Sequence, residues 1–181
     1  MIENCGEGTV VHAGAFFGDF LPALSKHCKK VRAFEPNTLN FQAAQETCRM
    51  NDLQNVILKH AALGHHFNSV MLEIETADGK KLGGGSKIVT ETDKANELVP
   101  QTTIDKEVDE HEHVSIIQLD VEGYELLALR GARKTILRCR PIVILELLQD
   151  KDFVFEVMNH LGYELANFKL HENFVFLPVD K

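Results

Sequence analysis

The sequence lacks closely spaced cysteine pairs, long apolar runs and basic segments, and each absence excludes a class of protein. Its four cysteines, Cys5, Cys28, Cys48 and Cys139, form no C-x-x-C motif, which predicts reduced thiols rather than a disulfide framework. No apolar run is long enough to cross a bilayer, and residues 1–4 lack the basic and apolar parts of a signal peptide. We therefore expect a cytoplasmic protein that does not associate with a membrane.

Basic residues are scarce relative to acidic ones. The 181-residue chain has 19 Lys and Arg against 27 Asp and Glu, a formal net charge of −8 at pH 7. This average charge repels a nucleic acid, and no basic stripe offsets it, so we expect no nucleic-acid substrate. At this length roughly 70% of the unfolded surface can be buried, which is enough for one domain with a full sheet and helices on both faces.

The dinucleotide fingerprint G-x-G-x-x-G is also absent, although a glycine turn follows the first apolar segment. Val10 and Val11 lead into a turn containing Gly14 and Gly18, and a second apolar segment then ends on Glu35. A carboxylate at that position can accept hydrogen bonds from both hydroxyls of a ribose. Because the missing glycine is the one that makes room for a pyrophosphate, the spacing disfavours NAD and FAD and favours S-adenosylmethionine.

Strand and helix signals alternate along the chain, which predicts an α/β fold with a doubly wound, mostly parallel sheet of seven strands. Residues 65–104 interrupt the alternation, and we interpret them as an insertion of β-hairpin type with a mobile glycine-rich bend, within a single domain of residues 1–181. The last two strands, joined by a tight turn, form a C-terminal antiparallel hairpin. The expected strands are 9–13, 31–35, 56–60, 114–120, 141–147, 163–168 and 174–177, and the expected helices are 19–28, 37–49, 123–138 and 153–161.

Several short motifs occur in one order along the chain. They are G-A-F-F-G at 14–18, F-E-P-N at 34–37, N-V at 55–56, A-L-G at 62–64, T-I-D at 103–105, L-D-V-E-G-Y-E at 119–125, L-R-G-A at 129–132, and R-P at 140–141 followed by Glu146. In this order they resemble FkbM-type methyltransferases, over roughly residues 9–178. The resemblance implies a class I, Rossmann-like fold and S-adenosylmethionine-dependent O-methylation of a hydroxyl on a small molecule or carbohydrate.

The first motif departs from the family pattern. This chain has H-A-G-A-F at 12–16 where the family usually has Asp-Val-Gly-Ala-Asn. The alternative hypothesis is therefore a non-catalytic binding scaffold that keeps the methyltransferase fold. The first strand also begins almost at the start of the sequence, so we expect the segment that often covers the substrate in class I enzymes to be short or absent.

Ligands of doubly wound sheets bind at the carboxyl ends of the strands, and the candidate cofactor-binding residues follow these ends. The glycine turn can pass under the amino-acid part of the cofactor, while Pro36 aims Glu35 towards the ribose. The alternatives are a tight turn without a ligand and an exposed acid before a helix cap. The expected cofactor-binding residues are Gly14, Ala15, Phe16, Gly18, Glu35, Pro36, Asn37, His60, Ala61 and Asp120.

Three residues are candidates for the chemical step. Asp120 and Glu122 follow a central strand, where one of them could take the proton of an attacking hydroxyl or hold the charged end of the donor, although Glu122 could instead cap the next helix. His12 could serve as the base, or simply be hydrogen-bonded at the pocket wall, as His60 could. Glu146 either lines the acceptor pocket or forms a structural ion pair.

Metal binding is not expected. The segments 65–66 (His-His) and 111–113 (His-Glu-His) lack the spacing of ligands on one helix face. The sequence leaves open the identity of the acceptor and whether the chain forms a homodimer.

Overall fold

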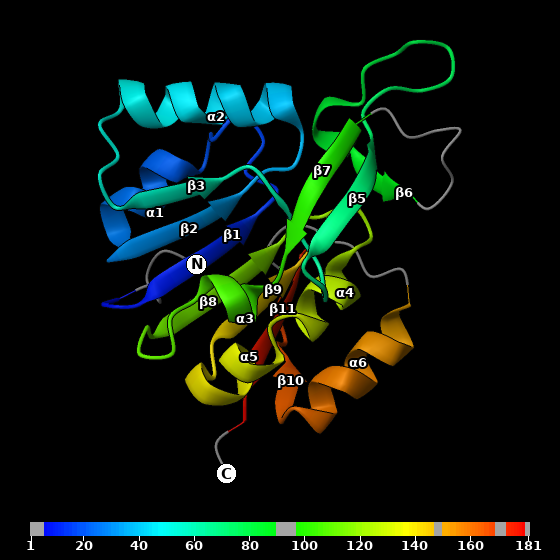
Figure 1. Cartoon of the computed structure of the whole chain (residues 1–181). Helices are drawn as coiled ribbons and strands as arrows, with labels where there is room; N and C mark the ends of the chain where they lie inside the picture. Colours follow the sequence, from blue (N-terminus) through cyan, green and yellow to red (C-terminus); the bar gives the residue numbers. More distant parts are fainter. Residues whose placement is uncertain (1–5, 90–96, 147–149, 169–172, 180–181) are drawn as a thin grey trace.

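The computed structural model describes residues 6–89, 97–146, 150–168 and 173–179, and its main sheet has seven strands (Figure 1). Their order is β10-β11-β9-β8-β1-β2-β3, with β11 antiparallel to both of its neighbours and the other pairings parallel. This confirms the predicted mostly parallel sheet with a C-terminal antiparallel hairpin, although part of the expected tight turn lies outside the described residues. The strands are β1 (Thr9–Ala13), β2 (Lys30–Phe34), β3 (Val56–Lys59), β8 (Val114–Leu119), β9 (Ile142–Leu145), β10 (Tyr163–Leu165) and β11 (Phe174–Pro178).

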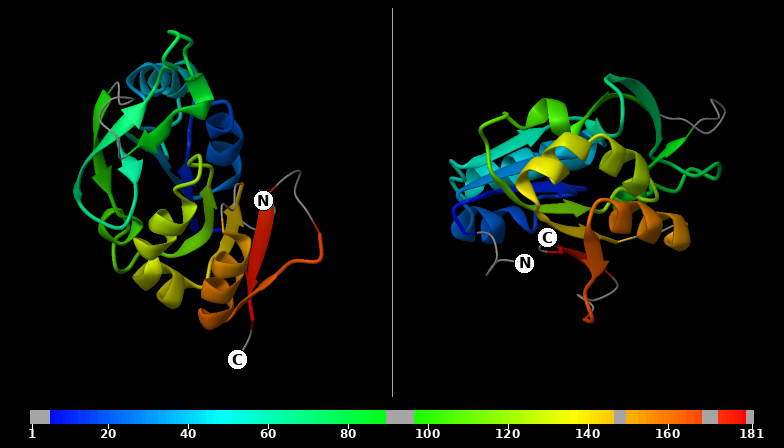
Figure 2. Two further views of the ribbon diagram at one scale, coloured as in Figure 1. Left: turned by 90° about the vertical axis from the view of Figure 1, so that its right-hand side faces the viewer. Right: turned by 90° about the horizontal axis from the view of Figure 1, so that it is seen from below.

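Helices cover both faces of this sheet because successive strand residues point to opposite sides (Figure 2). Val10 packs with α1 and α2 in one apolar cluster, whereas Val11 packs with α3, α4, α5 and α6 in another. Asn37 begins α2 by accepting hydrogen bonds from the amides of Leu39 and Asn40, at 3.0 and 3.2 Å, as expected of a helix cap. The helices are α1 (Leu21–His27), α2 (Thr38–Met50), α3 (Ile104–Glu107), α4 (Glu125–Arg130), α5 (Arg133–Cys139) and α6 (Lys151–His160).

Residues 62–102 contain a second, four-stranded sheet beside the carboxyl ends of the main strands (Figure 1). Its order is β4-β7-β5-β6, and Ala62, Leu72 and Val99 form a small core of its own. A short 3-10 turn, Gly83–Gly85, precedes its edge strand β6. The strands are β4 (Ala62–Leu63), β5 (Asn68–Glu73), β6 (Lys87–Val89) and β7 (Glu97–Thr102).

The cysteines differ in state. Cys28 takes part in a disulfide bond, whereas Cys48 and Cys139 are free. The expectation of reduced thiols is therefore wrong for Cys28. Among the helices of the described segments, none is long and apolar enough to cross a membrane.

Glu112, in the loop before β8, links this loop to β1 and β2 on the side of their amino ends. Its carboxylate accepts hydrogen bonds from Arg32 Nε at 2.8 Å, Arg32 Nη2 at 2.6 Å and Thr9 Oγ1 at 2.8 Å, and Lys30 Nζ lies 3.2 Å away. The hydrogen bonds from Arg32 dominate the lowering of the pKa of Glu112 to about 2. The H-E-H segment thus supplies a charge-assisted network that ties β1 to β2.

We expect Glu112→Gln to destabilise the protein at pH 7 by about 1–3 kcal/mol, because hydrogen bonds to a charged acceptor are lost. Because folding lowers the pKa of this carboxyl, its stabilisation is fully present above the unfolded value of about 4.3 and disappears as the pH falls towards 2. Urea unfolding at pH 7 and pH 3 measures both effects. Glu110→Gln, at a side chain 84% exposed, is the matched control and should change stability by less than about 0.5 kcal/mol. Identical urea midpoints for Glu112→Gln and wild type at pH 7 would contradict this.

Candidate functional site

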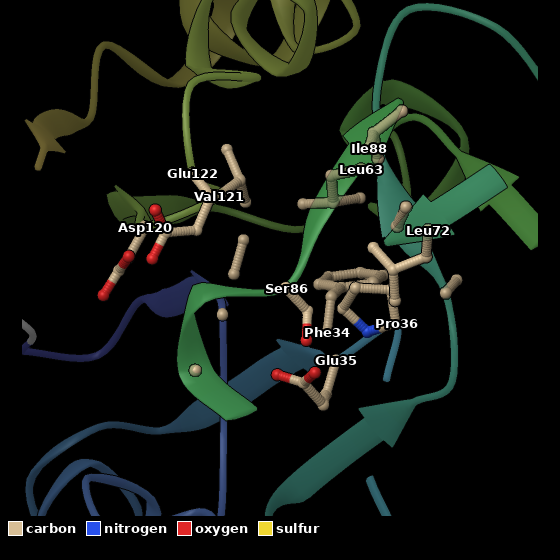
Figure 3. Close-up of a pocket in the computed structure, with 15 residues that line it drawn as sticks. Phe34, Glu35, Pro36, Leu63, Leu72, Ser86, Ile88, Asp120, Val121 and Glu122 are labelled. Carbon is tan, nitrogen blue, oxygen red and sulfur yellow. The ribbon is translucent and has the colours of Figure 1, made fainter. Parts of the chain in front are cut away.

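A pocket, partly open to solvent, lies where the main sheet meets the second sheet. In Figure 3, Asp120 and Glu122 lie on one side, apolar side chains including Leu63 and Leu72 lie on the other, and Glu35 lies below them, beside Ser86. Six of the predicted site residues line this cavity, namely Gly14, Glu35, Pro36, Ala61, Asp120 and Glu122.

Gly14 brings three strands together beneath the cavity. Its φ of +80° is a left-handed conformation, and its amide donates a hydrogen bond of 3.0 Å to Phe34 O. A Cβ atom on Gly14 would lie 2.1 Å from the backbone oxygen of Asp120. Both the backbone angle and the close approach therefore require glycine at this position.

Glu35 is almost fully buried and accepts three hydrogen bonds. Its Oε2 accepts from the amide of Phe16 at 2.8 Å, and its Oε1 accepts from the amide of Asn37 at 3.0 Å and from Asn40 Nδ2 at 3.4 Å. Burial raises the pKa of Glu35, while these hydrogen bonds act in the opposite direction. Since a carboxylate has about four acceptor positions, roughly one remains, on Oε2.

Residues 83–86, which we call the glycine strap, cross from the second sheet to the start of α2. Asn40 Nδ2 donates to Gly83 O at 3.1 Å, and Asn37 Nδ2 donates to Ser86 Oγ at 3.0 Å. The ring of Phe16 lies against Gly84, where a Cβ atom would be 3.3 Å from it. The strap therefore closes the cavity beside Glu35, as Figure 3 shows for Ser86.

The opposite end of the cavity is acidic. Asp120 follows β8, and its carboxyl lies within hydrogen-bonding reach of that of Glu146, which follows β9. Burial, together with Glu146 and Glu122, raises the pKa of Asp120 to about 8. Burial and Glu146 also raise the pKa of Glu122, whose backbone is left-handed with φ +52°. At least one of these groups can therefore hold a proton near neutral pH.

Glu125 is the acid that organises the turn between β8 and α4. Its buried carboxylate accepts from the amides of Val121 and Gly123, each at 3.3 Å. Glu122 does not cap α4, whose start has no side-chain cap hydrogen bond, and it lines the cavity instead. The sequence signal was present in the D-V-E-G-Y-E motif, because a side chain two residues after a glycine can reach back to its amide.

The two candidate histidines do not line the cavity. His12 faces α1, where it hydrogen-bonds Gln118 and meets the ring of Phe20 at 6.1 Å between centroids, and burial lowers its pKa. His60 Nε2 hydrogen-bonds Pro36 O at 2.8 Å, and its ring stacks on Phe41 at 4.8 Å. Ala15, Phe16, Gly18 and Asn37 lie in the turn and helix start behind the lining residues.

The sequence pattern gave no sign of the wall that the second sheet contributes. Leu63, Leu72, Ser86 and Ile88 line the cavity opposite the acids. They lie in or beside the segment interpreted as an insertion, and no local pattern in the sequence indicates that it folds back to this site.

Comparison with known proteins gives a match to one family and to several solved structures. The model of the methyltransferase FkbM domain matches residues 12–170. A methyltransferase FkbM from Methylobacillus flagellatus is 20% identical with a TM-score of 0.66, and the alignment covers 94% of this chain but 43% of that one. An rRNA methylase from Streptococcus thermophilus is 15% identical with a TM-score of 0.58, and the alignment covers 99% of this chain and 92% of that one. A protein from Streptococcus mutans in complex with S-adenosylhomocysteine (SAH) is 16% identical with a TM-score of 0.56, and the alignment covers 97% of this chain and 90% of that one. No curated protein matches the sequence. At such identities, the structural likenesses establish the class I fold alone.

Proposed function

The chain belongs to the FkbM methyltransferase family, and we propose that it transfers a methyl group from S-adenosylmethionine to a hydroxyl of a small molecule or carbohydrate. The observation that carries this proposal is the cavity at the carboxyl ends of β1, β2 and β8, with Glu35 at one end and Asp120 at the other. S-adenosylmethionine is the cofactor that the family membership implies, and when bound it supplies a methyl group on a positively charged sulfur.

The two ends of the cavity suit the two ends of this cofactor. Phe34, Leu63 and Ile88 offer apolar surface to an adenine ring, and the remaining acceptor position of Glu35 can bind a ribose hydroxyl. The acidic group of Asp120, Glu122 and the neighbouring Glu146 favours the cationic part of the cofactor at this end. The residues present therefore fit the group.

The same arrangement can orient an acceptor hydroxyl. Methyl transfer is an in-line displacement, and alignment of the reactants can contribute about 7–11 kcal/mol, compared with a factor of roughly 10²–10⁴ from a general base. Asp120 and Glu122 are the cavity-lining carboxyls available to accept the hydroxyl proton. A net charge of −8 favours a small acceptor over a polyanion.

Calorimetric titration with SAH, followed by incubation of the protein with methyl-labelled S-adenosylmethionine and a cell extract, tests this proposal. We expect binding below millimolar SAH and transfer of label to the small-molecule fraction of the extract. Binding without transfer would favour the non-catalytic scaffold. Absence of binding at millimolar SAH would exclude both the enzyme and a scaffold for this cofactor.

A further inference from the structure

Asp120 and Glu146 occupy equivalent positions on two neighbouring parallel strands. Leu119 of β8 pairs in register with Leu145 of β9, so the two acids follow at the same level of the sheet. The amide of Glu146 donates a hydrogen bond of 3.1 Å to Leu119 O, which holds the ends of β8 and β9 side by side at this level. The register therefore places the two carboxyls side by side, within hydrogen-bonding reach of each other. Since an ionised carboxylate only accepts hydrogen bonds, a bond between them needs a proton on one of the two groups.

The surroundings favour retention of that proton. Among the described residues, the charges that act most strongly on Asp120 are Glu146 from the end of β9, Glu122 from the turn after β8 and Glu125 from α4, and these three are acidic. Lys87 of β6 acts on Glu122, while its ammonium lies 3.6 Å from Glu73. Like charges at this distance disfavour joint ionisation, so these neighbours favour the protonated form of Asp120.

The two carboxyls differ in their access to the cavity. Asp120 lines it, whereas Glu146 is absent from the lining that the described residues form. Glu146 therefore acts on a ligand in the cavity through the carboxyls that line it, mainly through its neighbour Asp120 and also through its charge on Glu122. This makes Asp120 the group that faces the reacting atoms and Glu146 the group that supports it.

We propose that Asp120 and Glu146 form one proton-accepting unit, in which Asp120 takes the proton of the acceptor hydroxyl and Glu146 is the positioning residue that shares the proton already present. This inference rests on the proposed function. The acceptor oxygen forms its bond to the methyl carbon while the carbon–sulfur bond breaks and its electron pair stays on sulfur. The hydroxyl proton passes to Asp120, the shared proton moves to Glu146, and one proton later leaves to water.

Carbon-13 NMR of the side-chain carboxyls tests the pair in the full chain without any ligand. In the wild type we expect one carboxyl to titrate at least about two pH units above the ordinary Asp value of about 3.9, and Asp120→Asn should remove its signal. Glu146→Gln should lower that midpoint by at least about one unit, a tenfold fall in proton affinity, because a neighbouring negative charge is replaced by a hydrogen-bond donor. Glu164→Gln, on the exposed part of β10, is the control and should leave the midpoint unchanged.

The pH profile of methyl transfer tests the role of the pair, with labelled S-adenosylmethionine and the small-molecule fraction of a cell extract. Glu146→Gln should move the acid limb of the profile to lower pH by the shift seen in the titration. A merely structural Glu146 would lower the rate equally at all pH values, which would overturn the inference, as would an unchanged midpoint in the titration. If Glu146→Gln does not fold, Glu146→Ala removes the same charge and is judged by the same outcomes.

The two proposals can fail separately. A wild-type protein that binds no SAH contradicts the proposed function, whatever its carboxyls do. A wild-type protein that binds SAH and transfers label, but in which Asp120 titrates at its ordinary value, overturns the shared proton alone.

Discussion

Replacing Gly14 by Ala should destabilise the protein by about 3–5 kcal/mol. The left-handed backbone at this residue is strained for any L side chain, and this contributes about 1–2 kcal/mol. The larger part arises because the new methyl group would lie 2.1 Å from the backbone oxygen of Asp120, so that β1 and β8 must separate. Urea unfolding monitored by circular dichroism measures the change in the free energy of unfolding.

Gly79→Ala is a matched control for this prediction. Gly79 has nearly the same φ, +83°, but no atom lies within 4 Å of the position of its Cβ. It should therefore show the backbone strain alone, about 1–2 kcal/mol. Equal effects of the two substitutions would mean that the close approach of β1 and β8 does not limit the residue at position 14.

Glu35→Gln should weaken SAH binding at least about 100-fold, which corresponds to roughly 2.7 kcal/mol. The amide nitrogen of Gln cannot accept a hydrogen bond, so the amide of either Phe16 or Asn37 would face another donor in a buried site. The turn after β1 would then separate from the start of α2, and the site for the ribose would be lost. Isothermal titration calorimetry with SAH measures this change.

The control for Glu35→Gln is Glu46→Gln on α2. Glu46 is exposed and pairs with Arg49 on the outside of the same helix. Its replacement should change SAH affinity by less than about twofold and stability by less than about 0.5 kcal/mol. Unchanged SAH binding by Glu35→Gln would show that the carboxylate between β2 and α2 does not hold the cofactor.

The main sheet could be predicted from the sequence because its signals are local. The glycine turn at Gly14, the cap at Asn37 and the apolar run of β9 each follow from neighbouring residues. The second sheet could not be predicted in detail, since β5 pairs with both β6 and β7, and β4 consists of two residues. Pairing between segments distant in sequence depends on tertiary packing rather than on local propensity.

The candidate site shows a similar division. Strand ends indicated the level of the sheet at which Glu35 and Asp120 would lie, and both line the cavity. His12 also lies near a strand end, but its side chain points to the α1 face. The strand boundary and the resemblance to a family do not say to which face of the sheet a side chain at a strand end points. That orientation depends on the exact residue at which the strand stops and the turn begins.

The two walls of the cavity draw on two cores, which meet at Leu63 of β4, because this residue packs in the core of the main sheet. Leu72 packs within the second sheet, whereas the residues that carry the acids belong to the strands of the main sheet. Substitutions in the smaller core can consequently reshape the pocket while the larger fold keeps most of its free energy of folding. Such a division lets related chains diversify in the molecules they accommodate without rebuilding the frame that holds the reacting groups.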